Sequence, residues 1–362
     1  MFKEEAEKLV LKLSDESGKV LNIIPISTQF TLNTICESAM GVKLSNLGDD
    51  GVVYRKNIYE VGRLLIHRAL RPWLHTDALY KFFGGRKELD IVLQPVHYFT
   101  KSIIKKRKAN FTMKHEKTHT EDEMAEGDEN VYFRSKKQRR AMMDTLLQAQ
   151  ANGLIDDDGI IEETDTFTFE GHDTTSAAMT FTLLLLAHQP EAQNKIFEEI
   201  EDLLHDKVNL TIDHFNQMEY LDRAVKECLR IYPPVPFIGH VFAENFTHDG
   251  FTHSKGSTID IHIYDIHRDP EIFPDPEKFD PDRFLAENTA NRNNFAFLAF
   301  SAGMRNCIGQ RFAMLEIKVM VTKIIQKFQI SPITTRDEIV FIGDLVLRSR
   351  DPIKMKFNLR KK

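Results

Sequence analysis

The feature that most constrains this chain is Cys307, which ends a glycine-containing loop directly before a long helical pattern. An unperturbed cysteine has a pKa of about 8.5, so a thiolate at neutral pH needs electrostatic help. Arg305 lies two residues away, and the helix expected from residue 310 would turn its unbonded N–H groups toward the sulfur. Gly303 and Gly309 allow a tight turn and the close approach of a flat ligand. The surroundings of Cys307 therefore favour a stabilised thiolate, although a lone cysteine is more often a small buried apolar residue.

The spacing of the loop resembles a known cofactor site. Phe300 to Gly309 reads F-x-x-G-x-R-x-C-x-G, which resembles the haem-binding loop of the cytochromes P-450. The resemblance implies a haem b cofactor whose iron has Cys307 as its axial ligand. It also implies that Arg305 pairs with a haem propionate. Phe300, Gly303 and Gly309 would then shape the binding loop.

A second motif lies inside a long and otherwise apolar helical segment. Residues 165–175 read D-T-F-T-F-E-G-H-D-T-T. Glycine in mid-helix costs about 1 kcal/mol relative to alanine, and hydroxyl side chains can divert backbone hydrogen bonds. Such a segment could be a kinked core helix or a polar stripe that faces solvent. G-x-D-T-T, however, resembles the distal helix of the cytochromes P-450, which implies that Asp173 and Thr174 relay protons to bound dioxygen.

The full eleven-residue string resembles family 4 of these enzymes in particular. In many members a glutamate at the position of Glu170 forms an ester with a haem methyl group, so we expect the same of Glu170. The alternative is that Glu170 is a charged residue pointing into a polar cavity. Members of family 4 are commonly fatty-acid ω-hydroxylases, and this membership is the basis for expecting such a substrate.

A third motif predicts structural support for the loop. Glu227 and Arg230 are three residues apart and share one helix face, just before Tyr232 and two prolines. On another helix they would form a surface ion pair of at most about 1 kcal/mol. Here E-x-x-R resembles the same superfamily, and Arg283 would be the third member of a buried cluster. Its expected role is structural, because it would fix the loop that carries the thiolate.

Composition is that of an ordinary globular protein. The chain has 362 residues, of which 42% are hydrophobic and 28% charged, and its net charge of −6 gives no reason to expect nucleic-acid binding. Three widely spaced cysteines argue against a disulfide framework. Periodicity predicts a mainly α fold with a small β portion late in the chain. The predicted helices cover 57–70, 88–109, 136–152, 160–188, 192–205, 215–231 and 310–327, and the predicted strands cover 258–264 and 353–360.

The resemblance extends over essentially the whole chain, and it predicts one catalytic domain over residues 1–362. The polar segment 114–130 is expected to be a surface loop. No run of 18 apolar residues is present, so no transmembrane helix is predicted. Family members carry a membrane anchor, a first sheet and several helices before the point where this chain begins, so we expect a chain truncated at its N-terminus. The full-length protein would lie on the cytosolic face of the endoplasmic reticulum membrane.

The resemblance thus implies a haem-thiolate monooxygenase that inserts one oxygen atom of O2 into a C–H bond of a small lipophilic substrate. An NADPH-dependent flavoprotein reductase would supply electrons. The alternative is a non-catalytic haem-binding or apo remnant of such an enzyme. A haem-thiolate isomerase or peroxygenase is a third possibility, against which the presence of Asp173 and Thr174 argues, since O2 activation is what needs their protons.

Overall fold

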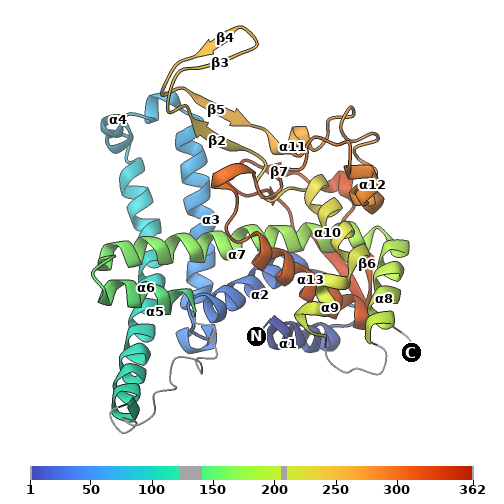
Figure 1. The fold of residues 1–362 in the computed structure, drawn as a ribbon, viewed down its shortest axis with the longest axis horizontal. Helices are drawn as coiled ribbons and strands as arrows, with labels where there is room; N and C mark the ends of the chain where they lie inside the picture. The colour runs from blue at the N-terminus through green and yellow to red at the C-terminus, as the bar shows by residue number, and fades with distance from the viewer. Residues whose placement is uncertain (1, 123–140, 205–209, 361–362) are drawn as a thin grey trace, which may run out of the picture. The chain divides into compact units, whose positions relative to one another are not determined.

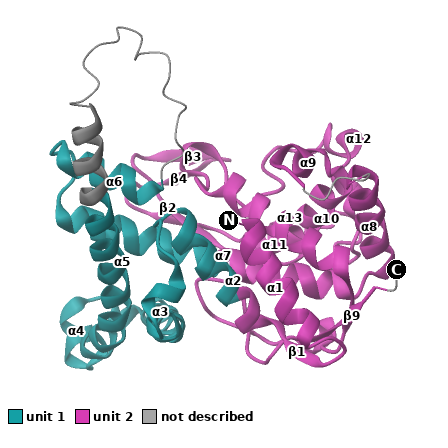
Figure 2. Ribbon diagram, turned by 90° about the horizontal axis from the view of Figure 1, so that it is seen from below, with its two compact units in different colours: residues 1, 28–173 teal, residues 2–27, 174–362 magenta. Residues whose placement is uncertain are grey.

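The structure is a computed structural model, and it describes residues 2–122, 141–204 and 210–360. The chain forms two units, residues 28–173 (unit 1) and residues 2–27 with 174–362 (unit 2) (Figure 2). The division falls within two helices, α2 (Ile23–Ser38) and α7 (Asp157–Ala187). The prediction of a single catalytic domain stays a prediction.

Unit 1 is built from helices (Figure 1). Besides its parts of α2 and α7 it contains α3 (Asp50–Ala69), α4 (Asp77–Phe82), α5 (Gly85–Asp122) and α6 (Met142–Ala151), with short 3-10 turns at Leu44–Leu47 and Pro72–Leu74. The Tyr54 ring of α3 lies 4.5 Å from the Phe99 ring of α5, and both side chains are fully buried. Arg107 of α5 binds Asp144 of α6 through two hydrogen bonds of 2.6 Å. The unit therefore has its own apolar core and its own partly buried ion pair.

Unit 2 contains the remaining helices. They are α1 (Phe2–Asp15), α8 (Pro190–Leu204), α9 (Ile212–Gln217), α10 (Glu219–Ile231), α11 (Ile263–Ile266), α12 (Ala286–Thr289) and α13 (Gln310–Lys327), with 3-10 turns at Pro281–Phe284, Gly303–Arg305 and Arg336–Glu338. The buried residues of α10 recur at helical spacing and place one apolar face in the core. α13 is buried over most of its length from Glu316 to Ile325, as expected of a helix that is apolar on most faces.

The strands of unit 2 are short and antiparallel. One sheet has the order β1 (Val20–Asn22), β9 (Lys354–Leu359), β6 (Phe328–Pro332). Three strand pairs complete the set: β2 (Ile238–Val241) with β5 (Thr258–Ile261), β3 (Phe246–His248) with β4 (Phe251–His253), and β7 (Phe341–Ile342) with β8 (Arg348–Ser349). In β9, Met355 and Phe357 are fully buried between more exposed lysines, so the alternation seen in the sequence does mark a strand.

The mainly α prediction with a small β portion is confirmed. The helices predicted at 57–70, 88–109, 160–188, 192–205 and 310–327 are present, in most cases with longer bounds. The helix predicted at 136–152 is present from Met142, while residues 136–140 lie outside the described residues. No helix within the described ranges is long and apolar enough to cross a membrane.

Three predicted boundaries are wrong. The loop predicted at 114–130 is helical over 114–122 as the end of α5, and residues 123–130 lie outside the described residues. The predicted helix 215–231 is two helices, because Met218 leaves the helical conformation and the Glu199 carboxylate accepts the N–H groups of Tyr220 and Leu221. The strand predicted at 258–264 ends at Ile261.

Candidate functional site

The Cys307 loop is closed by hydrogen bonds of its own backbone. The Cys307 N–H donates to the Phe300 carbonyl at 2.9 Å, and the Asn306 N–H donates to the Gly303 carbonyl at 3.2 Å. Gly303 has a φ of +79°, which a residue without Cβ adopts without strain, and Ser301 has a φ of +59°. The loop is therefore a compact turn that ends where α13 begins.

The thiol of Cys307 is presented at the surface of this turn. Its side chain is exposed, and α13 starts at Gln310 with Gly309 at the N-cap position. A Cβ added to Gly309 would lie 3.7 Å from the Cys307 sulfur, at ordinary van der Waals distance, so Gly309 lies directly beside the sulfur. The first N–H groups of α13 and the positive end of its dipole favour negative charge at this place.

Glu170, Asp173 and Thr174 follow one another along α7. The helix is continuous from Asp157 to Ala187, so the polar motif does not interrupt it. Asp173 is fully buried. It is the last residue of unit 1, and Thr174 is the first residue of the second segment of unit 2. The Glu170 side chain is largely accessible, yet partial burial of its carboxyl, and secondly the negative charge of Glu163, raise its pKa above the ordinary value.

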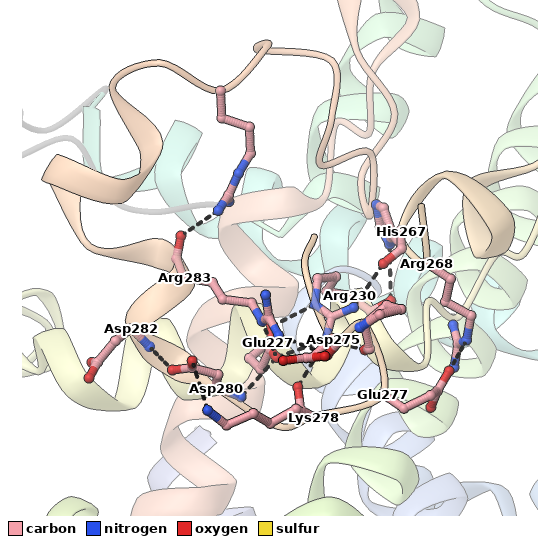
Figure 3. A network of polar contacts seen from close by, with 12 residues as sticks. Glu227, Arg230, His267, Arg268, Asp275, Glu277, Lys278, Asp280, Asp282 and Arg283 are labelled. Atoms are coloured by element: carbon pink, nitrogen blue, oxygen red, sulfur yellow. Dashed lines mark hydrogen bonds and ion pairs between the residues drawn. The ribbon is translucent and has the colours of Figure 1, made fainter. Parts of the chain in front are cut away.

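Glu227, Arg230 and Arg283 come together in unit 2 (Figure 3). Glu227 and Arg230 are fully buried and joined by two hydrogen bonds of 2.7 and 2.8 Å. The Arg283 Nε lies 3.4 Å from a Glu227 oxygen, which is an ionic contact rather than a hydrogen bond. The same oxygen accepts the Asp280 N–H at 2.9 Å. A buried carboxylate is thus surrounded by donors, as a charge away from water requires.

Sequence reasoning missed the backbone partners of this cluster. Arg230 donates to the carbonyls of His267 at 2.8 Å and Pro276 at 2.7 Å, and Arg283 donates to the Asp275 carbonyl at 2.9 Å. The cluster therefore fixes the irregular segment 267–283 through its main chain. A carbonyl is common to every residue type, so no sequence signal could have identified these acceptors.

His267 extends the network toward the Cys307 loop. Its Nδ1–H donates to the Arg230 carbonyl at 3.2 Å, and its Nε2 accepts the Leu298 N–H at 2.8 Å, two residues before Phe300. These two bonds require the neutral ring. Burial, followed by the positive charges of Arg230 and Arg268, lowers the pKa of His267 to about 3. His267 therefore joins α10 to the start of the loop as an uncharged bridge.

Comparisons with known proteins identify the family of this chain. A family model described as "Cytochrome P450" matches residues 1–357. The chain belongs to the cytochrome P450 family. It is 42% identical over 362 residues to "Probable cytochrome P450 4ac1" of Drosophila melanogaster, covering 100% of this chain and 69% of that protein. It is 36% identical to "Cytochrome P450 4p1" of the same species, covering 98% of this chain and 68% of that protein. It is 37% identical to human "Cytochrome P450 4V2", covering 99% of this chain and 68% of that protein.

Cytochrome P450 enzymes are haem-thiolate monooxygenases, and the Cys307 loop fits such a cofactor. Met304 and Ile308, on either side of the cysteine, are 102% and 83% exposed. Apolar side chains in that setting suit the face of a porphyrin. The exposed Arg305 offers a positive charge for an acidic edge. Among the described residues no cluster of His, Cys, Asp and Glu could hold a separate metal ion.

Proposed function

We propose that Cys307 is the thiolate ligand of the haem iron in this monooxygenase. The observation that carries the proposal is the exposed Cys307 side chain at the N-terminus of α13. The helix dipole favours the thiolate there, and Arg305 would bind a haem propionate. Phe300, Gly303 and Gly309 would hold the loop against the cofactor. When bound, the haem supplies the redox chemistry that activates dioxygen.

Asp173 and Thr174 would supply the protons. A carboxyl group can take up and release a proton near neutral pH when its surroundings allow, and a hydroxyl can accept one hydrogen bond while donating another. Both residues are consecutive on α7, so one rigid helix fixes their order. Asp173 would pass a proton to Thr174, whose hydroxyl would donate toward the reacting oxygen.

The proposed substrate is a lipophilic molecule, with fatty-acid ω-hydroxylation as the reaction. The family 4 motif around Glu170 supports this class, as do the family 4 names of the relatives. We also assign Glu170 to an ester with the haem, which would stiffen the site toward terminal carbons. Because an ester needs the carboxyl group close to an apolar ring, the desolvation that raises the pKa of Glu170 is in keeping with this role.

The proposed electron donor is an NADPH-dependent flavoprotein reductase, and the proposed location of the full-length protein is the cytosolic face of the endoplasmic reticulum membrane. Both follow from family membership. No contact among the described residues bears on the reductase or on the membrane.

The test is the optical difference spectrum of the reduced, carbonyl-bound protein. Cys307 ligation gives a strongly red-shifted Soret band, which Cys307→Ala removes. Cys36→Ala is the matched control, because this cysteine is buried in α2 and its loss should leave the band unchanged. Haem bound with an unshifted band would overturn the assignment of Cys307. No haem uptake at all would favour the alternative of a non-catalytic remnant.

A further inference from the structure

Three buried polar atoms in unit 1 have no hydrogen-bond partner among the described residues. They are the hydroxyl of Tyr54 on α3, the hydroxyl of Thr168 on α7 and one carboxylate oxygen, Oδ1, of Asp165 on α7. Tyr54 and Thr168 are fully buried. Buried polar groups in native proteins are hydrogen-bonded, and ordered water supplies the bond where the chain does not. Three such atoms in one unit therefore indicate buried water.

Tyr54 lies against the polar motif of α7. Its ring is 5.6 Å from the ring of His172, the residue before Asp173. Burial first, then the charges of Cys36, Asp173 and Asp165, raise the pKa of the Tyr54 hydroxyl well above its ordinary value. The hydroxyl is thus within the electrostatic reach of both carboxylates and stays protonated. A protonated phenol can accept one hydrogen bond and donate another at the same time.

Asp165 is connected to solvent through His97. His97 of α5 is 44% exposed, and its Nδ1 lies 2.7 Å from Oδ2 of Asp165. Nδ1–H therefore donates to the carboxylate, and Nε2 is left to exchange protons with water. Oδ2 of Asp165 faces this imidazole, while Oδ1 is the buried atom without a partner.

The spacing along α7 requires intermediates between the two carboxylates. Asp165 and Asp173 are eight residues apart, which is about 12 Å along a helix axis. Direct proton transfer over that distance is excluded, because a hydrogen bond spans about 3 Å. Thr168 stands between them on the helix, and Tyr54 reaches the same region from α3. Two hydroxyls with water between them could bridge the interval.

We propose that His97, Asp165, Thr168 and Tyr54 form, with buried water, the path by which protons reach Asp173 from solvent. This inference rests on the proposed role of Asp173. A proton enters at His97 Nε2 while the Nδ1 proton passes to Asp165. Asp165 then releases a proton to water held by Thr168 and Tyr54, and that chain delivers one proton to the Asp173 carboxylate. Asp165, Thr168 and Tyr54 end as they began, whereas His97 ends with its proton on Nε2 and must return that proton to water and regain one on Nδ1 before the next transfer. One proton moves inward for each proton that Asp173 gives up. All four are relay residues in this proposal.

The first test does not depend on turnover. A high-resolution crystal structure of the haem-loaded protein should show ordered water within hydrogen-bond distance of the Tyr54 and Thr168 hydroxyls. Tyr54→Phe should lose the water bound to that hydroxyl. Direct bonds from these atoms to other side chains, without water, would overturn the path even if the enzyme is active.

The second test measures proton supply. In Asp165→Asn, Tyr54→Phe and Thr168→Val, we expect kcat to fall about tenfold or more, with a larger solvent deuterium isotope effect and more peroxide released per NADPH consumed. Thr164→Val is the matched control, because the buried Thr164 hydroxyl already donates to the Ile160 carbonyl at 2.6 Å and needs no water. Variants that behave like this control would refute the path.

His97 offers a rescue experiment, because its ring is partly exposed. His97→Ala should show the same slow proton supply, and added imidazole should restore most of the rate. Loss of rate without rescue, and without a change in isotope effect, would indicate a structural role and contradict the proposal. A wild-type protein that binds no haem would instead contradict the proposed function, and the crystallographic test would still decide whether the water is there.

Discussion

At the scale of single residues, His267 shows how a buried imidazole can serve as a neutral connector. It accepts from the Leu298 N–H and donates to the Arg230 carbonyl, so protonation would oppose the first bond. Its partners could not be predicted, because both are main-chain atoms. Glu227 and Arg230, in contrast, could be paired from their three-residue spacing alone.

Acid should therefore lower the free energy of unfolding through His267. The pKa falls from an ordinary 6.5 to about 3 on folding, so the stabilisation is complete above pH 6.5 and is lost as pH falls toward 3. Between pH 7 and pH 5 the contribution of this group to the free energy of unfolding should drop by about 2 kcal/mol. Urea titrations should show a smaller drop over this interval in His267→Asn. His248→Asn, at an exposed position, should keep the wild-type pH dependence, and equal slopes in all three proteins would contradict the prediction.

Glu170 gives a second prediction at this scale. If Glu170 is esterified to the haem, extraction of turned-over enzyme with acid and organic solvent should leave the haem on the polypeptide. Glu170→Gln should release it completely, because an amide cannot form that link. Glu163→Gln, on the same helix, should retain the haem. Complete extraction from the wild type after turnover would remove Glu170 from this role.

At the scale of elements, α2 and α7 approach closely within unit 1 at Gly171. A Cβ built there would lie 2.5 Å from Cδ1 and 2.7 Å from Cγ1 of Ile35. The glycine that looked costly for a helix is thus required by its neighbour. The sequence located this helix and its polar motif, but it could not reveal Ile35 as the reason for the glycine. Similarly, the apolar residues keep helical spacing through Met218, so the sequence pattern does not indicate the break between α9 and α10.

Gly171→Ala should destabilise the protein by about 1–3 kcal/mol, even though alanine is the better helix former by about 1 kcal/mol. Combining it with Ile35→Ala should relieve the clash and give a favourable coupling free energy above about 0.5 kcal/mol in a double-mutant cycle. Combination with Ile103→Ala, a fully buried residue of α5, should be additive. Additivity in both cycles would show that the contact carries no strain.

At the scale of the whole molecule, haem binding should be coupled to stability. A ligand that binds only the folded state at 100 times its Kd adds about 2.7 kcal/mol to the free energy of unfolding. Haem-loaded protein should therefore melt at a higher temperature than haem-free protein, and Cys307→Ala should lose most of the increase. Coincident melting curves with and without haem would contradict this coupling.

The family and its chemistry could be predicted from the ten residues around Cys307, whereas the arrangement that supports them depends on contacts between distant segments.

The buried Glu227 carboxylate also has a consequence for synthesis on the ribosome. Arg230 can pair with it as soon as α10 forms, but the Asp280 N–H that completes its shell lies 53 residues further along the chain. At about 5–20 residues per second, translation needs roughly 3–10 s to reach that point. Until then the Glu227 carboxylate lacks one of the donors that replace water in the folded protein, so the apolar face of α10 stays exposed. During that interval the apolar face of α10 would be a binding site for a chaperone.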